Sequence, residues 1–183
     1  MWTLPNILTM SRIFVIPILV ASFYMKQPLG SHIAFILFFF AGITDFFDGY
    51  LARATGSVSK IGVFLDPIAD KLMVGAILLM VVATGWVSGI HVVAAVIIMC
   101  RELLVSGLRE FLAGIQVSVP VSMAAKWKTT VQMLALGALC WAKGGAAFDI
   151  PSLEIGIALL WAAAVLTLYT GYDYLRAGLK HMV

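Results

Sequence analysis

The sequence contains few charged residues for its length. Only 11% of the 183 residues are Asp, Glu, Lys or Arg, whereas 62% are hydrophobic, and the mean hydropathy is +1.05. This composition lies far outside the range of soluble globular proteins and excludes an ordinary soluble domain. We therefore expect an integral membrane protein.

Cysteine and histidine are also scarce. The two cysteines, Cys100 and Cys140, lie inside apolar runs and lack the spacing of metal ligands or of a disulfide framework. The histidines, His32, His91 and His181, fall near the ends of apolar runs or in the C-terminal tail. We expect both cysteines to pack as small core residues and no histidine to be a metal ligand.

Long apolar runs occupy most of the chain. A helix needs about 20 residues to cross roughly 30 Å of hydrocarbon. The sequence offers six such segments, at residues 5–25, 32–53, 62–84, 88–111, 122–143 and 152–176. Short pieces rich in Gly, Pro and Ser separate them, and none is long enough to link two domains. The sequence therefore predicts an all-α fold of six transmembrane helices in one domain, residues 1–183.

The basic residues are distributed unevenly over the predicted loops. With a cytoplasmic N-terminus, the outer loops carry only Lys26 and Lys143. The inner loops and helix ends then carry Arg12, Arg53, Lys60, Arg109, Lys126, Lys128, Arg176 and Lys180. The positive-inside rule therefore predicts that both termini are cytoplasmic. The same asymmetry explains the pI of about 9.0, so we expect contact with anionic lipids and no nucleic-acid partner. No basic region precedes the first apolar run, so we expect this helix to be retained rather than cleaved as a signal peptide.

Four of the nine carboxylates are concentrated in "DFFDGYLARATGSVSKIGVFLDPIAD". They are Asp45, Asp48, Asp66 and Asp70. At helical spacing the first two share one face with small residues, and the last two share a similar face on the next helix. Two antiparallel neighbours can thus present four carboxylates to a polar cavity that opens toward the cytoplasm.

A cluster of carboxylates at a membrane boundary requires cations. Pairing with Arg53, Lys60 or Lys71 near the helix ends is one solution, because intramembrane charges commonly pair. Oxygen ligands without His or Cys also suit Mg²⁺ or Mn²⁺. Four acids on facing stripes with glycines between them favour two divalent ions, which is typical of phosphoryl chemistry.

These residues carry a resemblance to the CDP-alcohol phosphatidyltransferase family. Its signature, D-x2-D-G-x2-A-R-x8-G-x3-D-x3-D, is matched at every fixed position by Asp45, Asp48, Gly49, Ala52, Arg53, Gly62, Asp66 and Asp70. The segments "PNILTMSRI", "RELLVSGLREF" and "KWKTTVQM" resemble the bacterial branch whose acceptor is glycerol 3-phosphate.

The resemblance implies an activity and a set of roles. The activity is transfer of a phosphatidyl group from CDP-diacylglycerol to glycerol 3-phosphate with release of CMP, in the bacterial cytoplasmic membrane. Asp45, Asp48 and Asp66 would ligate two divalent ions, and Asp70 would complete the metal site and act as the general base. The remaining signature positions would line the CDP pocket, namely Gly49, Ala52, Arg53 and Gly62. The resemblance also implies a homodimer.

An anionic acceptor needs cations of its own. We expect Arg101, Arg109 and Lys126 to form a basic pocket for glycerol 3-phosphate. Lys128 lies about 200° from Lys126 around the helix, so both cannot face the cavity. Thr129 and Thr130 flank the face of Lys126, which favours Lys126 and leaves Lys128 as a topology signal.

Purely structural roles remain open for several of these polar residues. Arg101 could pair with a carboxylate, and Arg109 with Glu110 could form a solvated helix end. Asn6, Thr9 and Arg12 could contact the nucleotide or simply cap and anchor the first helix.

Two alternative functions are consistent with the carboxylate motif. One is the same transfer to another alcohol, such as an inositol phosphate, serine or phosphatidylglycerol. The other is a divalent-cation transporter, which would also place acids around an ion path. Transport requires access from both sides of the membrane, whereas these acids cluster at one end, so the sequence favours the enzyme.

Overall fold

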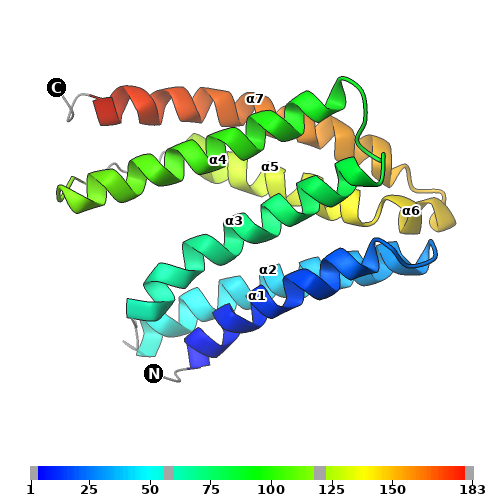
Figure 1. Ribbon diagram of the computed structural model, residues 1–183, viewed down its shortest axis with the longest axis horizontal. Helices are drawn as coiled ribbons and strands as arrows, with labels where there is room; N and C mark the ends of the chain where they lie inside the picture. Colours follow the sequence, from blue (N-terminus) through cyan, green and yellow to red (C-terminus); the bar gives the residue numbers. More distant parts are fainter. Residues whose placement is uncertain (1–3, 56–59, 118–122, 180–183) are drawn as a thin grey trace.

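The computed structural model describes residues 4–55, 60–117 and 123–179; within these ranges, the side chains of residues 4–6, 46–55, 60, 61, 63, 147, 177 and 179 are not described. Every regular element in these ranges is helical, so the all-α prediction is confirmed there (Figure 1). The long helices are α1 (Leu4–Ser22), α2 (Leu29–Thr55), α3 (Lys60–Ala83), α4 (His91–Gly114), α5 (Met123–Cys140) and α7 (Ser152–Leu179). They correspond one to one with the predicted apolar segments.

The end of the fifth helix differs from the prediction. We expected helix to residue 143, but α5 ends at Cys140, and a short α6 (Ala142–Gly145) and a 3-10 turn (Ala146–Phe148) follow. The backbone of Trp141 leaves helical geometry, with φ −93° and ψ 9°. Gly145 then lies so close to α7 that a Cβ there would be 1.5 Å from the Ser152 Oγ. Glycine thus lets the chain turn tightly where apolar composition alone suggested a continuing helix.

The long helices form two groups. Helix α1 packs against α2 and α3, and α7 packs against α4 and α5, while contacts of α2 with α5 and of α3 with α4 join the groups. Figure 1 shows the groups diverging toward the side on which both chain ends lie. An even number of long helices accounts for the two ends lying together.

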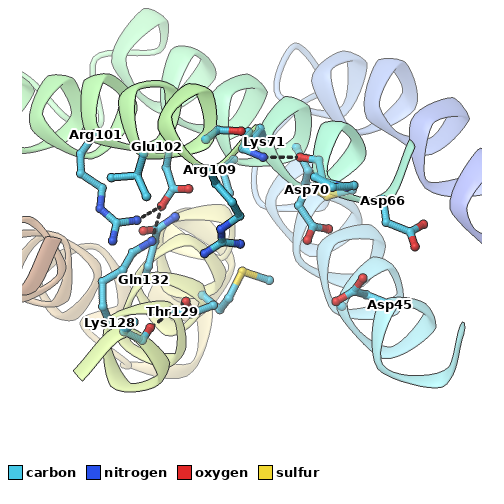
Figure 2. A pocket seen from close by; sticks show the side chains of 18 of the residues that line it. Asp45, Asp66, Asp70, Lys71, Arg101, Glu102, Arg109, Lys128, Thr129 and Gln132 are labelled. Atoms are coloured by element: carbon cyan, nitrogen blue, oxygen red, sulfur yellow. Dashed lines mark hydrogen bonds and ion pairs between the residues drawn. The ribbon is translucent and has the colours of Figure 1, made fainter. Parts of the chain in front are cut away.

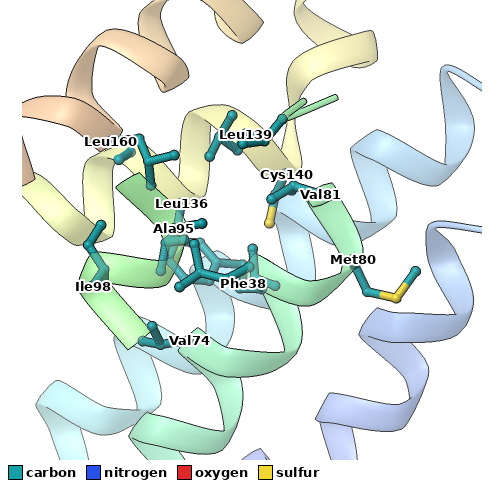
Figure 3. Close-up of a cluster of buried hydrophobic side chains, with 14 of the residues drawn as sticks. Phe38, Val74, Met80, Val81, Ala95, Ile98, Leu136, Leu139, Cys140 and Leu160 are labelled. Carbon is teal, nitrogen blue, oxygen red and sulfur yellow. The ribbon is translucent and has the colours of Figure 1, made fainter. Parts of the chain in front are cut away.

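The core lies where the groups meet. Leu136 and Leu139 of α5, Val81 of α3, Ile98 of α4 and Leu160 of α7 are completely buried there (Figure 3). These interdigitating apolar side chains fix how the two groups are joined, and so position the polar side chains farther along the same helices.

The two cysteines have different environments. Cys140 is buried in the core, as predicted, but Cys100 is exposed, so the prediction of a core position for Cys100 is wrong. Cys100 lies two positions after the buried Ile98 on α4, which rotates it about 200° to the opposite face of the helix.

Large apolar side chains also cover much of the exterior. Phe14, Phe40, Leu79, Val165 and Tyr169 are among those that are more than half exposed. Within the described residues, His91–Gly114 and Ser152–Arg176 are long and apolar enough, by length and composition, to cross a membrane. An apolar exterior around an apolar core is typical of helices that face lipid.

Candidate active site

A cavity of about 540 Å³ lies between the two groups of helices. Residues of α1, α2, α3, α4, α5 and α7 contribute to its wall. Its charged lining residues are Arg12, Asp45, Asp66, Asp70, Lys71, Arg101, Glu102, Arg109, Glu110 and Lys128. Figure 2 shows the aspartates on one side of this space and Arg101, Glu102 and Lys128 on the other, with Arg109 reaching between them. The cavity therefore has an acidic end and a basic end.

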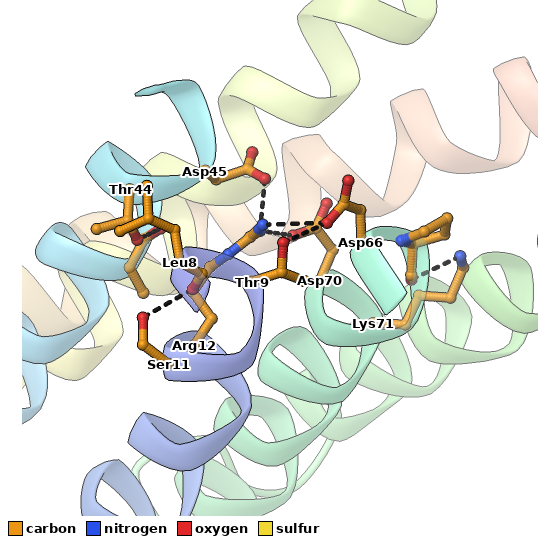
Figure 4. A network of polar contacts seen from close by, with 11 residues as sticks. Leu8, Thr9, Ser11, Arg12, Thr44, Asp45, Asp66, Asp70 and Lys71 are labelled. Carbon is orange, nitrogen blue, oxygen red and sulfur yellow. Dashed lines mark hydrogen bonds and ion pairs between the residues drawn. The ribbon is translucent and has the colours of Figure 1, made fainter. Parts of the chain in front are cut away.

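The acidic end is organised around the guanidinium of Arg12 (Figure 4). The Arg12 Nη1 lies 2.5 Å from the Asp45 Oδ1 of α2 and 2.9 Å from the Asp70 Oδ1 of α3. The Arg12 Nη2 lies 3.7 Å from the Asp66 Oδ1. The expected meeting of the α2 and α3 carboxylates is thus present, but it occurs through a cation carried by α1.

Helix α1 supplies a second contact to the same carboxylates. The Thr9 Oγ1 donates a hydrogen bond to the Asp66 Oδ1 at 2.6 Å. Thr9 and Arg12 lie three residues apart, so they share a helix face, and both are buried. In the structure the polar face of α1 therefore contacts the aspartates through Thr9 and Arg12, and the side chain of Asn6 lies outside the described residues.

Of the cations first considered as partners of the aspartates, the structure describes the side chain of Lys71 alone. Lys71 donates a hydrogen bond to the backbone oxygen of Pro67 at 2.9 Å. The side chains of Arg53 and Lys60 lie outside the described residues. The sequence did hold a signal for Arg12, because a charged residue within an apolar helix is costly unless it is paired.

The donor set at the acidic end suits a hard divalent cation. Asp45, Asp66 and Asp70 present only oxygen, and their side chains are about half exposed and so accessible from the cavity. In the part of the chain that the structure describes, however, no three His, Cys, Asp or Glu side chains are close enough to hold a metal ion. The carboxylates are spread around a guanidinium instead, so the chemistry fits a metal while the spacing fits Arg12.

The remaining signature residues lie on α2 and α3. Asp48, Gly49, Ala52 and Arg53 belong to the last two turns of α2, and their side chains lie outside the described residues. Gly62 is buried at the start of α3, one turn before Asp66. Their predicted roles toward metal and nucleotide therefore stay predictions.

The basic end contains a network of charged side chains that are little exposed. Lys128 of α5 donates a hydrogen bond to the Glu102 Oε1 of α4, and the Arg101 Nη1 lies 3.6 Å from the same oxygen. The Arg101 Nη2 donates to the Thr170 Oγ1 of α7 at 3.0 Å. A Cβ at Gly171 would lie 3.1 Å from the Arg101 Cγ, so the small residue leaves room for this arginine. Arg101 thus pairs with a carboxylate and lines the cavity as well.

Arg109 lies at the middle of the cavity wall. It is exposed, and its Nη2 donates to the Tyr174 hydroxyl at 3.3 Å. Its guanidinium carbon lies 5.6 Å from the centroid of the Tyr174 ring, within cation–π range. Tyr174 orients Arg109, and this role of the last helix had no clear signal in the sequence.

The prediction that Lys126 faces the cavity is wrong. Lys126 is exposed, whereas Lys128 is buried and lines the cavity. The hydroxyls of Thr129 and Thr130 donate to the backbone oxygens of Ala125 and Lys126, respectively, so they do not mark a phosphate-binding face. The carboxylate of Glu102 on the facing helix provides the charge that stabilises a buried lysine at 128.

Comparison with known proteins assigns the chain to a family. The family profile described as CDP-alcohol phosphatidyltransferase matches residues 2–169. The chain belongs to the CDP-alcohol phosphatidyltransferase family. Members of this family generally use divalent metal ions, in agreement with the oxygen-only donor set of the acidic end.

Individual members of the family are similar over nearly the whole chain. A protein of Rickettsia bellii is 47% identical over 178 residues, which covers 97% of this chain and 96% of that protein. A protein of Haemophilus influenzae is 40% identical over 181 residues, covering 96% and 92%. Both are named CDP-diacylglycerol--glycerol-3-phosphate 3-phosphatidyltransferase. The resemblance found in the sequence is confirmed.

Proposed function

We propose that this chain is a phosphatidylglycerophosphate synthase. It transfers the phosphatidyl group of CDP-diacylglycerol to glycerol 3-phosphate, forming phosphatidylglycerophosphate and CMP. The observation that carries the proposal is the 40–47% identity, over nearly full length, to relatives named for this reaction. The two-ended cavity supports it, because a donor pyrophosphate and an anionic acceptor need separate binding groups.

The acidic end serves the pyrophosphate of CDP-diacylglycerol. Asp45, Asp48 and Asp66 hold two divalent ions, Mg²⁺ or Mn²⁺, and Asp70 completes this set. When bound, the ions supply positive charge to the pyrophosphate and to the leaving CMP. Arg12 occupies the shared position among the carboxylates, so its guanidinium must shift when the carboxylates take up metal.

Asp70 has a second role in this proposal. Its carboxylate takes the proton of the acceptor hydroxyl as the oxygen attacks phosphorus, which is general-base catalysis. Asp70 lines the cavity and lies on the side that faces Arg109 (Figure 2). This position is suitable for a group that acts on an acceptor held between the two ends.

The nucleotide is bound by the signature residues around the aspartates. Gly49, Ala52 and Gly62 are small enough to admit a flat base against the helix backbone. Arg53 offers a guanidinium to a phosphate group. These roles follow from the family signature, which this chain matches at each position.

The basic end holds the phosphate of the acceptor. Arg101, Arg109 and Lys128 provide three cations, and Glu102 offsets part of their charge. Lys128 takes the place predicted for Lys126, because it is the lysine that lines the cavity. Charge-assisted hydrogen bonds to a phosphate dianion are stronger than neutral ones, so this end favours a phosphorylated acceptor over free glycerol or serine.

The enzyme works within a membrane. Helices α1 to α5 and α7 span the bacterial cytoplasmic membrane as a single domain, with both termini in the cytoplasm, and two copies form a homodimer. The apolar exterior supports this arrangement, as does the position of both chain ends on one side (Figure 1). The charge asymmetry of the loops gives the orientation.

A purified-enzyme assay tests the proposed function. CMP release is measured with CDP-diacylglycerol and a panel of acceptors: glycerol 3-phosphate, inositol phosphate, serine and phosphatidylglycerol. Of these acceptors, we expect only glycerol 3-phosphate to support CMP release. Chelation of divalent cations should abolish that release. A better rate with another acceptor would assign the chain to another branch of the family, and flux of Mn²⁺ without either substrate would indicate transport.

A further inference from the structure

Gln132 is a buried polar residue in the wall of the cavity. Its side chain lies on α5, one turn after Lys128, and is 4% exposed. Its Oε1 has no hydrogen-bond partner among the residues that the structure describes. Buried polar atoms in proteins are nearly always paired, because leaving one unpaired is costly. A ligand in the cavity that donates a hydrogen bond to this oxygen would remove that cost.

Two polar neighbours of Gln132 on α5 donate hydrogen bonds to other groups. Lys128 donates to Glu102, and the hydroxyl of Thr129 donates to the Ala125 oxygen at 3.1 Å. Figure 2 shows Gln132 beside Lys128 and Glu102 at the basic end. The structure therefore leaves an acceptor atom next to the cations that would bind a phosphate.

The kind of atom restricts the kind of ligand. Phosphate and carboxylate oxygens only accept hydrogen bonds when ionised, so they cannot pair with an amide oxygen, whereas a hydroxyl can donate to it. Residues four apart on a helix have Cβ atoms about 5–6 Å apart. Lys128 and Gln132 can thus reach two groups of one small molecule, an anionic group and a nearby hydroxyl.

We propose that Gln132 accepts a hydrogen bond from the acceptor hydroxyl that does not attack, and so makes the enzyme select, among phosphorylated alcohols, those that carry a second hydroxyl. This inference rests on the proposed function. Glycerol 3-phosphate carries two hydroxyls: the terminal one, which is less hindered, attacks phosphorus, and the middle one remains free to pair with the Gln132 Oε1. Gln132 is a specificity-determining residue that touches substrate without taking part in proton transfer.

The test compares two acceptors on two forms of the enzyme. 3-Hydroxypropyl phosphate retains the phosphate and the terminal hydroxyl but lacks the middle hydroxyl. We expect wild-type kcat/KM for glycerol 3-phosphate to exceed that for 3-hydroxypropyl phosphate by about 10-fold or more, as expected for one buried hydrogen bond. Gln132→Met keeps a similar shape without the amide, and should bring the two values within about 2-fold, because only the glycerol 3-phosphate contact is lost.

The outcomes separate this inference from the proposed function. Equal kcat/KM for both acceptors in the wild type overturns the inference, whatever Gln132→Met does. The inference also fails if Gln132→Met lowers kcat/KM by the same factor for both acceptors. The latter result would mean that Gln132 only supports the fold. If the wild type releases no CMP with glycerol 3-phosphate, the proposed function itself fails. Unchanged KM for CDP-diacylglycerol in Gln132→Met is expected, since the nucleotide binds at the other end.

Discussion

The two ends of the cavity each enclose a residue of opposite charge, but they differ in exposure. At the acidic end, the Arg12 side chain is only 3% exposed, but Asp45, Asp66 and Asp70 around it are 47%, 47% and 57% exposed. At the basic end, Glu102 lies between Arg101 and Lys128, and these three side chains are 17%, 12% and 5% exposed, respectively.

This difference indicates how each end works. Half-exposed carboxylates can take up a further cation from the cavity, because water on that side screens their charges. Buried charges cannot separate without a large desolvation cost. The acidic end is therefore suited to taking up and releasing metal ions with each nucleotide, and the basic end to holding a fixed shape for one acceptor.

The largest expected effect is loss of the acidic end. Asp45→Asn, Asp48→Asn and Asp66→Asn should each abolish CMP release, because an amide brings no charge to a hard cation. Mn²⁺ binding, measured on the same proteins without substrate, should weaken in parallel. Turnover near wild type at low Mg²⁺ in any of the three would contradict its assignment as a ligand.

Asp70→Asn should separate chemistry from binding at the same end. Loss of a general base lowers kcat by about 10²–10⁴-fold. CDP-diacylglycerol binding, measured by displacement of a labelled nucleotide, should weaken far less than in Asp45→Asn. Equal loss of binding in the two variants would instead make Asp70 chiefly a ligand.

Replacing the enclosed residue of each end, Arg12 at the acidic end and Glu102 at the basic end, compares the two ends directly. Glu102→Gln leaves the buried Lys128 without its carboxylate, and breaking a buried pair in this way costs about 3–5 kcal/mol of stability. Relative to wild type, the thermal unfolding midpoint of Glu102→Gln should fall by the same amount in EDTA as in Mn²⁺. Arg12→Gln should lower the midpoint in EDTA but recover much of the loss in Mn²⁺, because metal can neutralise the half-exposed aspartates. The same response in both variants would remove the distinction between the ends.

The sequence predicted the long helices and the meeting of three of the four aspartates, for physical reasons. The lengths of the apolar runs predicted six long helices, and the spacing of Asp45, Asp66 and Asp70 brought them to one surface. The role of Arg12 could not be predicted in the same way. A helical pattern places Arg12 on the face of Thr9, but its contacts depend on α1 packing against both α2 and α3.

The error at the fifth helix has a related cause. Periodicity gives the angle between Lys126 and Lys128, yet it does not give the rotation of the helix relative to its neighbours. That rotation depends on packing with α7, where α5 approaches so closely that a Cβ at Gly156 would lie 2.9 Å from the Leu139 side chain. Gln132 was missed together with Lys128, because both belong to the face that this packing turns inward.

The smallest effects are expected at two exposed cations that form a matched pair, Arg109 and Lys126. Arg109 lines the cavity and is oriented by Tyr174, whereas Lys126 is exposed and is not part of the cavity wall. Arg109→Ala should raise the KM for glycerol 3-phosphate about 10-fold, which corresponds to one charge-assisted contact that solvent partly screens. Lys126→Ala removes the same charge from outside the cavity and should change that KM by less than about 2-fold. Steady-state CMP release, with each substrate varied in turn, measures both values. A similar rise in both variants would show that the cations act through the overall charge of this surface, and a rise in Lys126→Ala alone would restore the face of α5 that the sequence first favoured.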